Sequence, residues 1–299
     1  MMYDLIIIGA GPGGLAAGIY ARYFRLNAVV LDNIEQPSQL AMAPKVANYP
    51  GVEQIPGTEL IERMKKQVKA LGGTIKEEKA SAIKMEKDKK VVYTDKGKYE
   101  TKSIIIATGA VHRQGGIKGE KEFMGKGVSY CATCDGIFYI GKSVVVLGGG
   151  DTALAYATYL KSIGCDVTLI HRRDEFRGAE QSVEVARKAG VKFVLKHTVQ
   201  EIVGKKSVEK VVLDDGTEIK CSGVFVAFGE VPVVDLFKSI GVKANEGGFI
   251  EVDGKMQTSV KGIYAVGDAT TTPFRQVAMA TGQATLAVFN ANKYVREQK

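Results

Sequence analysis

The sequence predicts an α/β protein built from two Rossmann-like units, because one strand–turn–helix pattern occurs twice. Apolar residues 5–8 lead into the glycine-rich turn Gly9–Gly14, and apolar residues 144–147 lead into the similar turn Gly148–Ala153. Short, fully apolar strands are typical of parallel sheets that are covered on both faces. A predicted helix follows each turn, over residues 15–23 and 154–162.

The spacing within the two units is the same. Gly9 and Asp32 are 23 positions apart, and Gly148 and His171 are also 23 positions apart. Each interval runs from the first glycine of the turn to the end of the second strand. The two units are therefore expected to superpose.

The first unit has the glycine pattern of a dinucleotide-binding turn. Gly9, Gly11 and Gly14 surround Pro12, and such glycines allow a tight turn, a close approach of a pyrophosphate and tight helix packing. The second strand ends at Asp32, whose carboxylate can accept the ribose hydroxyls of an adenosine.

The second unit ends differently, in His171-Arg172-Arg173 followed by Arg177. Arginines at this position suit a 2′-phosphate, which an acid would repel. The second unit is therefore expected to prefer NADP(H) to NAD(H). The alternative is that these arginines only keep a surface loop solvated.

The remaining elements follow in order. Residues 37–51 are predicted to form a loop, Thr58–Leu71 a helix with Thr58 as its N-cap, and residues 74–102 a strand-rich segment. After a glycine-rich linker at 115–127 and the second unit, Phe228–Pro232 returns the chain to the first unit. A last buried strand, Ile263–Val266, precedes Gly267-Asp268 and a long C-terminal helix.

Cys131 and Cys134 stand between the two glycine-rich turns, three positions apart. This spacing suits a redox-active disulfide, and a helix that began at Cys131 would lower the pKa of its thiol. Asp135 follows directly and can shuttle the accompanying proton. A zinc site is the alternative, but no second tight cysteine pair supplies the other ligands, so no metal is expected. Cys165 and Cys221 are predicted to be buried apolar residues.

Composition narrows the classes of protein. The 299 residues carry a net charge of +8, 45% are hydrophobic, and no apolar run reaches the length of about 18 residues that a membrane helix needs. No signal peptide or nucleic-acid-binding motif is present, so a cytoplasmic protein without membrane or nucleic-acid partners is expected. The basic charge is expected to solvate the surface or to steer an acidic protein partner.

Taken in order, these motifs resemble low-molecular-weight thioredoxin reductases over nearly the whole chain. Ala107-Thr108-Gly109, Cys131-Ala132-Thr133-Cys134-Asp135, the arginine-rich segment 171–177 and Arg275-Gln276 carry the resemblance together with both turns. The resemblance implies a three-layer ββα sandwich in each unit. An NADPH domain at 114–234 would be inserted into an FAD domain made of residues 1–113 and 235–299.

The resemblance also implies an enzyme that passes electrons from NADPH through FAD to the cysteine pair, and on to a thioredoxin- or glutaredoxin-like protein. Cys134 would face the flavin, Cys131 would attack the partner's disulfide, Asp135 would be the acid/base, and the protein would be a homodimer. Rotation of the NADPH domain about 115–127 and 228–234 is expected. The implied FAD-binding residues are Gly9, Gly11, Pro12, Gly14, Asp32, Gln39, Leu40, Asn48, Thr108, Gly109, Gly267, Asp268, Arg275, Gln276 and Val277. The implied NADPH-binding residues are Gly148, Gly150, Asp151, Thr152, His171, Arg172, Arg173 and Arg177.

Two segments depart from the family pattern. Pro37-Ser38-Gln39-Leu40 replaces the usual Gly-Gly-Gln-Leu, and residues 41–45 replace a threonine-rich stretch. Both segments lie near the expected flavin. A ferredoxin-dependent reductase and a dithiol oxidase that uses oxygen remain alternatives, although the arginines argue against both. A nucleotide-binding redox sensor without turnover is an alternative from another class.

Overall fold

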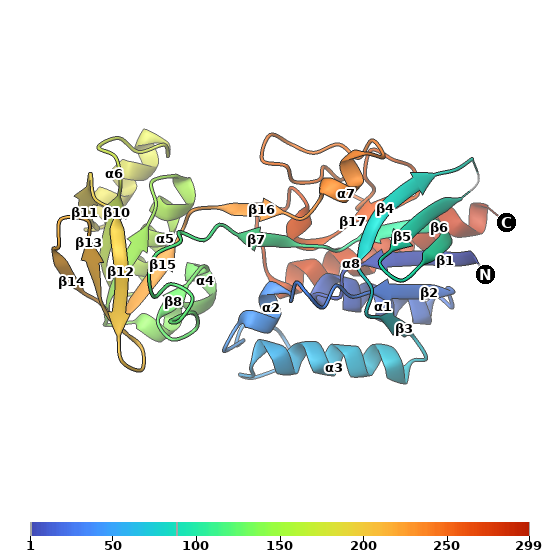
Figure 1. Ribbon diagram of the computed structural model, residues 1–299, viewed down its shortest axis with the longest axis horizontal. Helices are drawn as coiled ribbons and strands as arrows, with labels where there is room; N and C mark the ends of the chain where they lie inside the picture. Colours follow the sequence, from blue (N-terminus) through green and yellow to red (C-terminus); the bar gives the residue numbers. More distant parts are fainter. Residues whose placement is uncertain (1, 88, 299) are drawn as a thin grey trace. The chain divides into compact units, whose positions relative to one another are not determined.

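The computed structural model describes residues 2–87 and 89–298. The chain divides into two compact units, one formed by Met1–Val111 with Val231–Lys299 and the other by His112–Glu230 (Figure 1). The sequence placed the two boundaries slightly later, after residues 113 and 234.

The boundaries fall inside two short strands, which explains the difference. β7 (Ala110–His112) and β16 (Glu230–Pro232) pair with each other in a two-stranded sheet where the chain leaves and re-enters the first unit. The ladder continues beyond β7, since Arg113 donates its backbone N–H to the carbonyl of Gly229 at 2.9 Å. The two connections therefore form one paired segment rather than separate loops.

The first unit contains a seven-stranded sheet in the order β3-β2-β1-β6-β5-β4, with β17 also paired to β6. β1, β2, β3, β6 and β17 are parallel to their neighbours in this group, whereas β4 and β5 are antiparallel. The strands are β1 (Met2–Ile8), β2 (Ala28–Leu31), β3 (Thr74–Lys76), β4 (Ala80–Met85), β5 (Lys90–Thr94), β6 (Lys98–Ile106) and β17 (Ile263–Ala265).

The apolar run in β1 is buried on both faces of this sheet. Leu5 and Ile7 belong to one hydrophobic cluster, and Ile6 and Ile8 belong to another, because successive side chains of a strand point to opposite faces. Long helices cover the first face (Figure 1). On the second face, side chains of the antiparallel strands β4 and β5, which extend the sheet beyond β6, pack with a short helix against the parallel strands. The helices are α1 (Pro12–Tyr23), α2 (Gln39–Met42), α3 (Gly57–Ala70), α7 (Asp235–Lys238), the 3₁₀ helix η2 (Gly267–Ala269) and α8 (Val277–Glu297).

Two local predictions in the first unit were wrong. α3 begins at Gly57 with Pro56 at the N-cap, so Thr58 lies inside the helix. The predicted loop over 37–51 contains the one-turn helix α2, whose N-cap Ser38 accepts a hydrogen bond from the backbone of Ala41 at 3.3 Å. A helix of one turn is too short to show helical periodicity in the sequence.

The second unit repeats this plan. Its five-stranded parallel sheet has the order β11-β10-β9-β15-β8, and a separate antiparallel sheet has the order β12-β13-β14. The strands are β8 (Val128–Ser129), β9 (Ser143–Leu147), β10 (Asp166–His171), β11 (Lys192–Leu195), β12 (Val199–Gly204), β13 (Val208–Leu213), β14 (Glu218–Lys220) and β15 (Gly223–Val226). The helices are α4 (Ala132–Asp135), the 3₁₀ helix η1 (Gly136–Tyr139), α5 (Asp151–Ser162) and α6 (Glu180–Lys188).

The β9 side chains divide between two clusters as those of β1 do. Val144 and Val146 pack with α5, whereas Val145 and Leu147 pack with the antiparallel sheet. Each unit therefore has a helical layer, a parallel sheet and an antiparallel layer. The predicted α/β fold with two Rossmann-like units is confirmed.

Candidate redox site and nucleotide-binding turns

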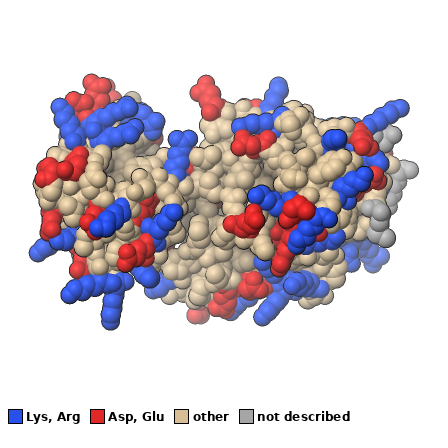
Figure 2. Space-filling view, in the orientation of Figure 1, with Lys and Arg blue, Asp and Glu red and all other residues tan. Residues whose placement is uncertain are grey.

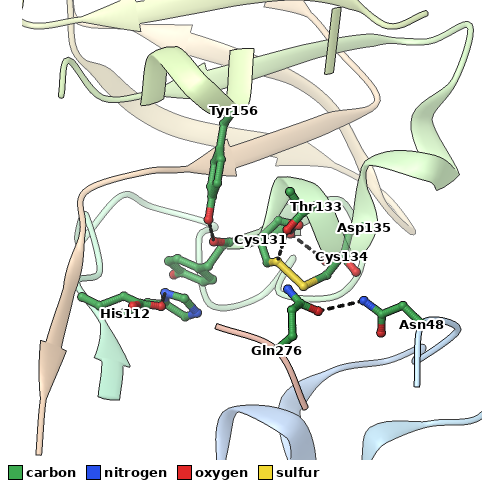
Figure 3. Close-up of a disulfide and its surroundings, with 11 residues drawn as sticks. Asn48, His112, Cys131, Thr133, Cys134, Asp135, Tyr156 and Gln276 are labelled. Carbon is green, nitrogen blue, oxygen red and sulfur yellow. Dashed lines mark hydrogen bonds and ion pairs between the residues drawn. A yellow bond between two sulfur atoms is a disulfide. The ribbon is translucent and has the colours of Figure 1, made fainter. Parts of the chain in front are cut away.

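The second unit holds a disulfide between Cys131 and Cys134, with an S–S distance of 2.11 Å and a Cα–Cα distance of 5.3 Å (Figure 3). Cys131 is the N-cap of α4, and its carbonyl accepts the backbone N–H of Asp135 at 3.1 Å. The hydroxyl of Thr133 lies 3.4 Å from the Cys131 Sγ. The Cα–Cα distance lies within the range that a disulfide can span.

Asp135 is tied to the strand before the disulfide. Ser129, the last residue of β8, donates its hydroxyl to Asp135 Oδ2 at 2.6 Å and accepts the backbone N–H of Cys131 at 3.1 Å. Burial raises the pKa of the Asp135 carboxyl, and the hydrogen bond from Ser129 opposes that rise. A carboxyl group with a raised pKa beside a disulfide holds its proton to a higher pH than a free carboxyl group, as a proton-exchanging group requires. The sequence offered no signal for the role of Ser129.

A buried carboxylate, Glu120, braces the segment around the disulfide. Glu120 is 1% exposed and accepts the backbone N–H groups of Gly115 and Ile117 at 3.0 and 3.1 Å, and the hydroxyl of Tyr130 at 2.6 Å. Burial and this hydrogen bond raise the pKa of Tyr130. Because Tyr130 immediately precedes Cys131, Glu120 connects the linker at 115–117 to the redox pair.

The backbone and ring of Tyr130 have further partners. Tyr156 on α5 donates its hydroxyl to the Tyr130 carbonyl at 3.1 Å, and the ring of His112 stacks on the Tyr130 ring at 5.0 Å between centroids. Nδ1 of His112 lies 3.3 Å from Oε1 of Glu230, across the paired connections. His112 thus lies where the chain passes from the first unit to the second.

The first glycine-rich turn requires glycine at two of its positions. A Cβ on Gly9 would lie 2.4 Å from the carbonyl oxygen of Ala107, and a Cβ on Gly14 would lie 1.8 Å from the carbonyl oxygen of Gly9. Gly11 is the N-cap of α1 and supplies no side-chain cap. The first-turn N–H groups of α1 are therefore available to an anionic group such as a pyrophosphate.

The second glycine-rich turn lies against His171. A Cβ on Gly149 would approach the His171 ring to 2.2 Å, and this ring is buried, stacks on Phe176 and bonds through Nε2 to the carbonyl of Glu175 at 3.1 Å. Burial lowers the pKa of His171. His171 therefore supports the turn from within, and the predicted contact of His171 with NADPH stays a prediction.

The three predicted arginines lie at the surface around this turn. Arg172, Arg173 and Arg177 are exposed, and within residues 2–87 and 89–298 none of them forms an ion pair with an acid. The Arg177 guanidinium lies 3.6 Å from the position of a Cβ on Gly150, the N-cap of α5, which has no side-chain cap. This cluster of cations beside a helix N-terminus suits a phosphate.

The two other residues predicted for this turn lie on the first turn of α5. Asp151 accepts the backbone N–H of Ala179 at 2.9 Å, so its carboxylate fastens the segment after the arginines to the helix. Thr152 is exposed.

Several residues predicted to bind the flavin converge within the first unit. Asn48 donates to Oε1 of Gln276 at 2.8 Å across 228 positions, and Gln39 donates to the carbonyl of Ala110 at 2.5 Å. Gln276 is the N-cap of α8, so its neighbour Val277 begins that helix. The loops at 37–51 and 270–276 are thus brought together, as a shared ligand site requires.

Other predicted residues differ in exposure. Asp268 is half-buried, and burial raises the pKa of its carboxyl while nearby Arg275 opposes the rise. The Arg275 guanidinium lies 4.2 Å from the centroid of the Phe249 ring. The Thr108 hydroxyl donates to the carbonyl of Val233 at 2.6 Å, and Leu40 is buried in the core. Gly109 and Gly267 adopt the left-handed backbone conformation that favours glycine.

Comparison with known proteins decides the family. A family model for pyridine nucleotide-disulphide oxidoreductases matches residues 3–284. The chain belongs to this family. The thioredoxin reductase of Bacillus subtilis (strain 168) is 38% identical in an alignment 305 residues long. The alignment covers 99% of this chain and 96% of the relative. These findings confirm the resemblance to thioredoxin reductases and make the chain an oxidoreductase.

Two solved structures extend the comparison. The thioredoxin reductase from Streptococcus pyogenes MGAS5005 is similar with a TM-score of 0.94, at 34% identity and 99% coverage of both chains. A ferredoxin-flavin thioredoxin reductase from Clostridium acetobutylicum is similar with a TM-score of 0.54, also at 34% identity and 99% coverage of both chains.

Within this family, the structure adds residues that sequence reasoning missed. Lys65 on α3 places Nζ 2.9 Å from Oδ2 of Asp32, so the acid at the end of β2 already has a cationic partner. Ser129, Glu120 and Tyr130 act around the disulfide through contacts between separate segments. Glycine patterns and cysteine spacing are local signals, whereas these contacts depend on the folded chain.

Cys165 and Cys221 are buried, as predicted, and have no disulfide. Burial raises the pKa of Cys221 to about 12 and also raises the pKa of Cys165. Thiols with raised pKa values are poor nucleophiles. Among the described residues, Cys131 and Cys134 are thus the pair with redox geometry.

Proposed function

We propose that this chain is an NADPH-dependent thioredoxin-disulfide reductase with FAD as its flavin. The observation that carries the proposal is the Cys131–Cys134 disulfide beside the half-buried acid Asp135, in a chain of this family. The proposed partner is a thioredoxin- or glutaredoxin-like protein with a disulfide.

Two features of the first unit support FAD binding, namely its glycine-rich turn and the loops that are brought together near it in the sequence-predicted site. The proposed contacts are the uncapped N-terminus of α1 with the pyrophosphate, and Asp32 with the adenosine ribose. Asp268 is half-buried and suited to bind ribityl hydroxyls, while Gln39, Asn48 and Gln276 line the remainder of the site. FAD, when bound, accepts a hydride and supplies two electrons to the disulfide.

The second unit fits NADPH better than NADH. Arg172, Arg173 and Arg177 are exposed beside the turn and suit a 2′-phosphate. The uncapped N-terminus of α5 suits the pyrophosphate. No acid stands at the end of β10 to accept the ribose hydroxyl in NADH, because His171 occupies that position.

The reduced cysteine pair carries out a balanced exchange. The Cys131 thiolate attacks one sulfur of the partner's disulfide, which forms a mixed disulfide and releases the other sulfur as a thiolate. Cys134 then attacks the Cys131 sulfur, which restores the Cys131–Cys134 bond and releases the second partner thiolate. The partner's two thiolates take up the two protons that the thiols of Cys131 and Cys134 lose, and Asp135 is the proposed group that moves a proton between them.

Two further features concern the surface charge and the length of the apolar helices. On the face shown in Figure 2, Lys and Arg are interspersed with Asp and Glu, which is typical of a solvated surface. In the described part of the chain, no helix is both long enough and apolar enough to cross a membrane. We propose a cytoplasmic location for the protein.

A homodimer is the proposed assembly, and the first unit offers an apolar surface for it. Tyr20 and Tyr23 on α1 and Leu286 and Phe289 on α8 are exposed, and α1 packs against α8. Apolar side chains gathered on a protein surface often mark an interface with another copy.

Reduction by ferredoxin is the main alternative, since the Clostridium acetobutylicum structure bears that name. The arginine cluster favours NADPH instead, because a ferredoxin-dependent enzyme has no 2′-phosphate to bind. The arginines argue against an oxidase as well, and the Cys131–Cys134 pair with Asp135 argues against a sensor without turnover.

Replacement of the cysteines tests the proposal. Cys131→Ser and Cys134→Ser are each expected to abolish NADPH-dependent reduction of a thioredoxin disulfide, measured by the appearance of thiols. Cys165→Ser is the matched control, and it is expected to retain turnover because Cys165 is buried and has no disulfide. Undiminished turnover in Cys131→Ser would contradict the proposed role of the pair.

A further inference from the structure

We infer that Ser129 is a positioning residue for proton transfer at the redox pair, because one hydroxyl holds both the Asp135 carboxylate and the Cys131 backbone. The inference rests on the proposed function of the Cys131–Cys134 pair. It assigns proton exchange to Oδ1 of Asp135, since Ser129 occupies Oδ2.

The position of Ser129 is fixed by the fold. Ser129 ends β8 and pairs with Phe225 of β15 at the edge of the parallel sheet. Ser129 is 6% exposed, so its hydroxyl has little access to bulk water as an alternative partner. A buried hydroxyl that makes two hydrogen bonds within one turn has a defined orientation.

The direction of the hydrogen bonds follows from the single hydroxyl proton. Ser129 Oγ lies 2.6 Å from Asp135 Oδ2 and 3.4 Å from the carbonyl oxygen of Cys131. The shorter contact involves a carboxylate, which makes the stronger, charge-assisted hydrogen bond. The proton therefore goes to Asp135, and an oxygen lone pair receives the N–H of Cys131 at 3.1 Å.

The surroundings of Asp135 make this one hydrogen bond decisive. Burial raises the pKa of Asp135, and the hydrogen bond from Ser129 is the influence that lowers it. The phenol of Tyr139 lies near Asp135, and its pKa is raised by burial and by the Asp135 charge, whereas the two cysteines do not titrate in the disulfide form. Among the described residues, no cation contributes to the pKa of Asp135.

Loss of the hydroxyl is expected to favour the protonated form of Asp135. Without a donor at Oδ2, the carboxylate would keep the cost of burial and lose its stabilising hydrogen bond. Asp135 would then hold its proton to a higher pH, so at a given pH a smaller fraction of the group would be the carboxylate that accepts a proton. The backbone of Cys131 would also lose the acceptor that fixes the start of α4.

Titration of the carboxyl group tests this inference without flavin, NADPH or thioredoxin. The disulfide form is labelled with ¹³C at aspartate carboxyl carbons, and the Asp135 resonance is assigned by its absence in Asp135→Asn. Ser129→Ala is expected to move the titration midpoint of Asp135 to higher pH. Ser129→Thr, which keeps a hydroxyl, is expected to leave the midpoint near that of the unaltered protein.

A kinetic comparison separates positioning from a structural role. The dithiol form is mixed with 5,5′-dithiobis(2-nitrobenzoate), and exchange is followed by absorbance from pH 5 to pH 9. Asp135→Asn is expected to slow exchange at pH 7 by about 100-fold and Ser129→Ala by about tenfold. In the Asp135→Asn background, Ser129→Ala is expected to have no further effect.

An unchanged Asp135 midpoint in Ser129→Ala would overturn the inference, and so would an equal rate loss in both backgrounds. Ser129→Gly, which also lacks the hydroxyl, takes the place of Ser129→Ala if the alanine variant does not fold. If thioredoxin is not a substrate but these shifts occur, the proposed function fails and the role of Ser129 stands.

Discussion

Lys90 on β5 is a charged side chain that the fold buries. Lys90 is 5% exposed, donates Nζ to the carbonyl of Lys102 at 2.7 Å, and lies 5.2 Å from the Tyr294 ring centroid. Burial lowers its pKa from 10.5 to about 8. The folded protein therefore holds this proton less tightly than the unfolded chain does.

The sign of the resulting pH dependence follows from proton binding. Between pH 8 and 10.5, the unfolded chain binds the Lys90 proton and the folded protein releases it, so stability rises with pH. Below pH 8 both states are protonated, and the cost of burying the charge is fully present. Lys90→Met is expected to raise the free energy of unfolding at pH 7 by up to roughly 3 kcal/mol, less the value of the lost hydrogen bond.

Urea denaturation at several pH values checks this prediction. The difference between Lys90→Met and the unaltered protein should shrink from pH 8 to pH 10.5. Lys98→Met, at an exposed position on the neighbouring strand, is the control and should show a nearly constant difference. A constant difference for Lys90→Met would show that the charge is not destabilised by the fold.

At the residue scale, the sequence predicted the reactive residues but not the residues that hold them in place. Cys131, Cys134 and Asp135 were identified because redox chemistry requires a fixed spacing of few residue types. Ser129 could not be identified, because serine is common and its role depends on the pairing of a two-residue strand with β15. Lys65 reaches Asp32 from a separate helix, and no local pattern marks such a contact.

At the scale of elements, the linker at 115–117 and the turn that carries the disulfide are held by one carboxylate. Glu120→Ala would leave two backbone N–H groups and the Tyr130 hydroxyl without their acceptor. An unsatisfied buried group costs about 1–3 kcal/mol, and these three groups are only partly buried, so a total loss of about 1–3 kcal/mol of unfolding free energy is expected.

Denaturant unfolding of matched variants measures this loss. Glu122→Ala removes an exposed carboxylate two positions away and is expected to change stability by less than about 0.5 kcal/mol. Glu120→Gln keeps one acceptor oxygen and should fall between the two. Equal losses for Glu120→Ala and Glu122→Ala would contradict the role of Glu120 as a brace.

Elements marked by an apolar run or a glycine-rich turn could be predicted from the sequence, whereas the one-turn helices and the two-residue strand β8 could not. Apolar runs identified β1, β9 and β17, and glycines placed the starts of α1 and α5 within a few residues. α2 and α4 have only one turn each, and β8 has two residues, so none of them has a measurable period. The start of α3 was misplaced because Pro56 and Gly57 begin the helix before Thr58.

At the scale of the whole molecule, the internal repeat predicted the fold. Equal spacing in the two units corresponds to equal strand orders, β2-β1-β6-β17 and β10-β9-β15-β8. The fourth strand of each set comes from a different place in the chain. β17 follows the other three strands of its set in the sequence, whereas β8 precedes the other three strands of its set. Spacing alone could not assign β8 to this position.

The proposed direction of electron flow depends on which residue ends the second strand of each repeat. Asp32 stands at the end of β2, and His171 with its neighbouring arginines stands at the end of β10. If the first unit holds FAD and the second holds NADPH, each nucleotide has the partner that its ribose requires. The choice of electron donor is therefore the central point to test.

Anaerobic stopped-flow absorbance of the purified, FAD-loaded protein tests this point most directly. Mixing with NADPH is expected to bleach the flavin rapidly, whereas NADH at the same concentration should bleach it at least about tenfold more slowly. A variant with both Arg172→Ala and Arg173→Ala should lose most of this difference. Equal bleaching by both nucleotides, or bleaching by reduced ferredoxin but by neither nucleotide, would contradict the assignment of NADPH as the donor.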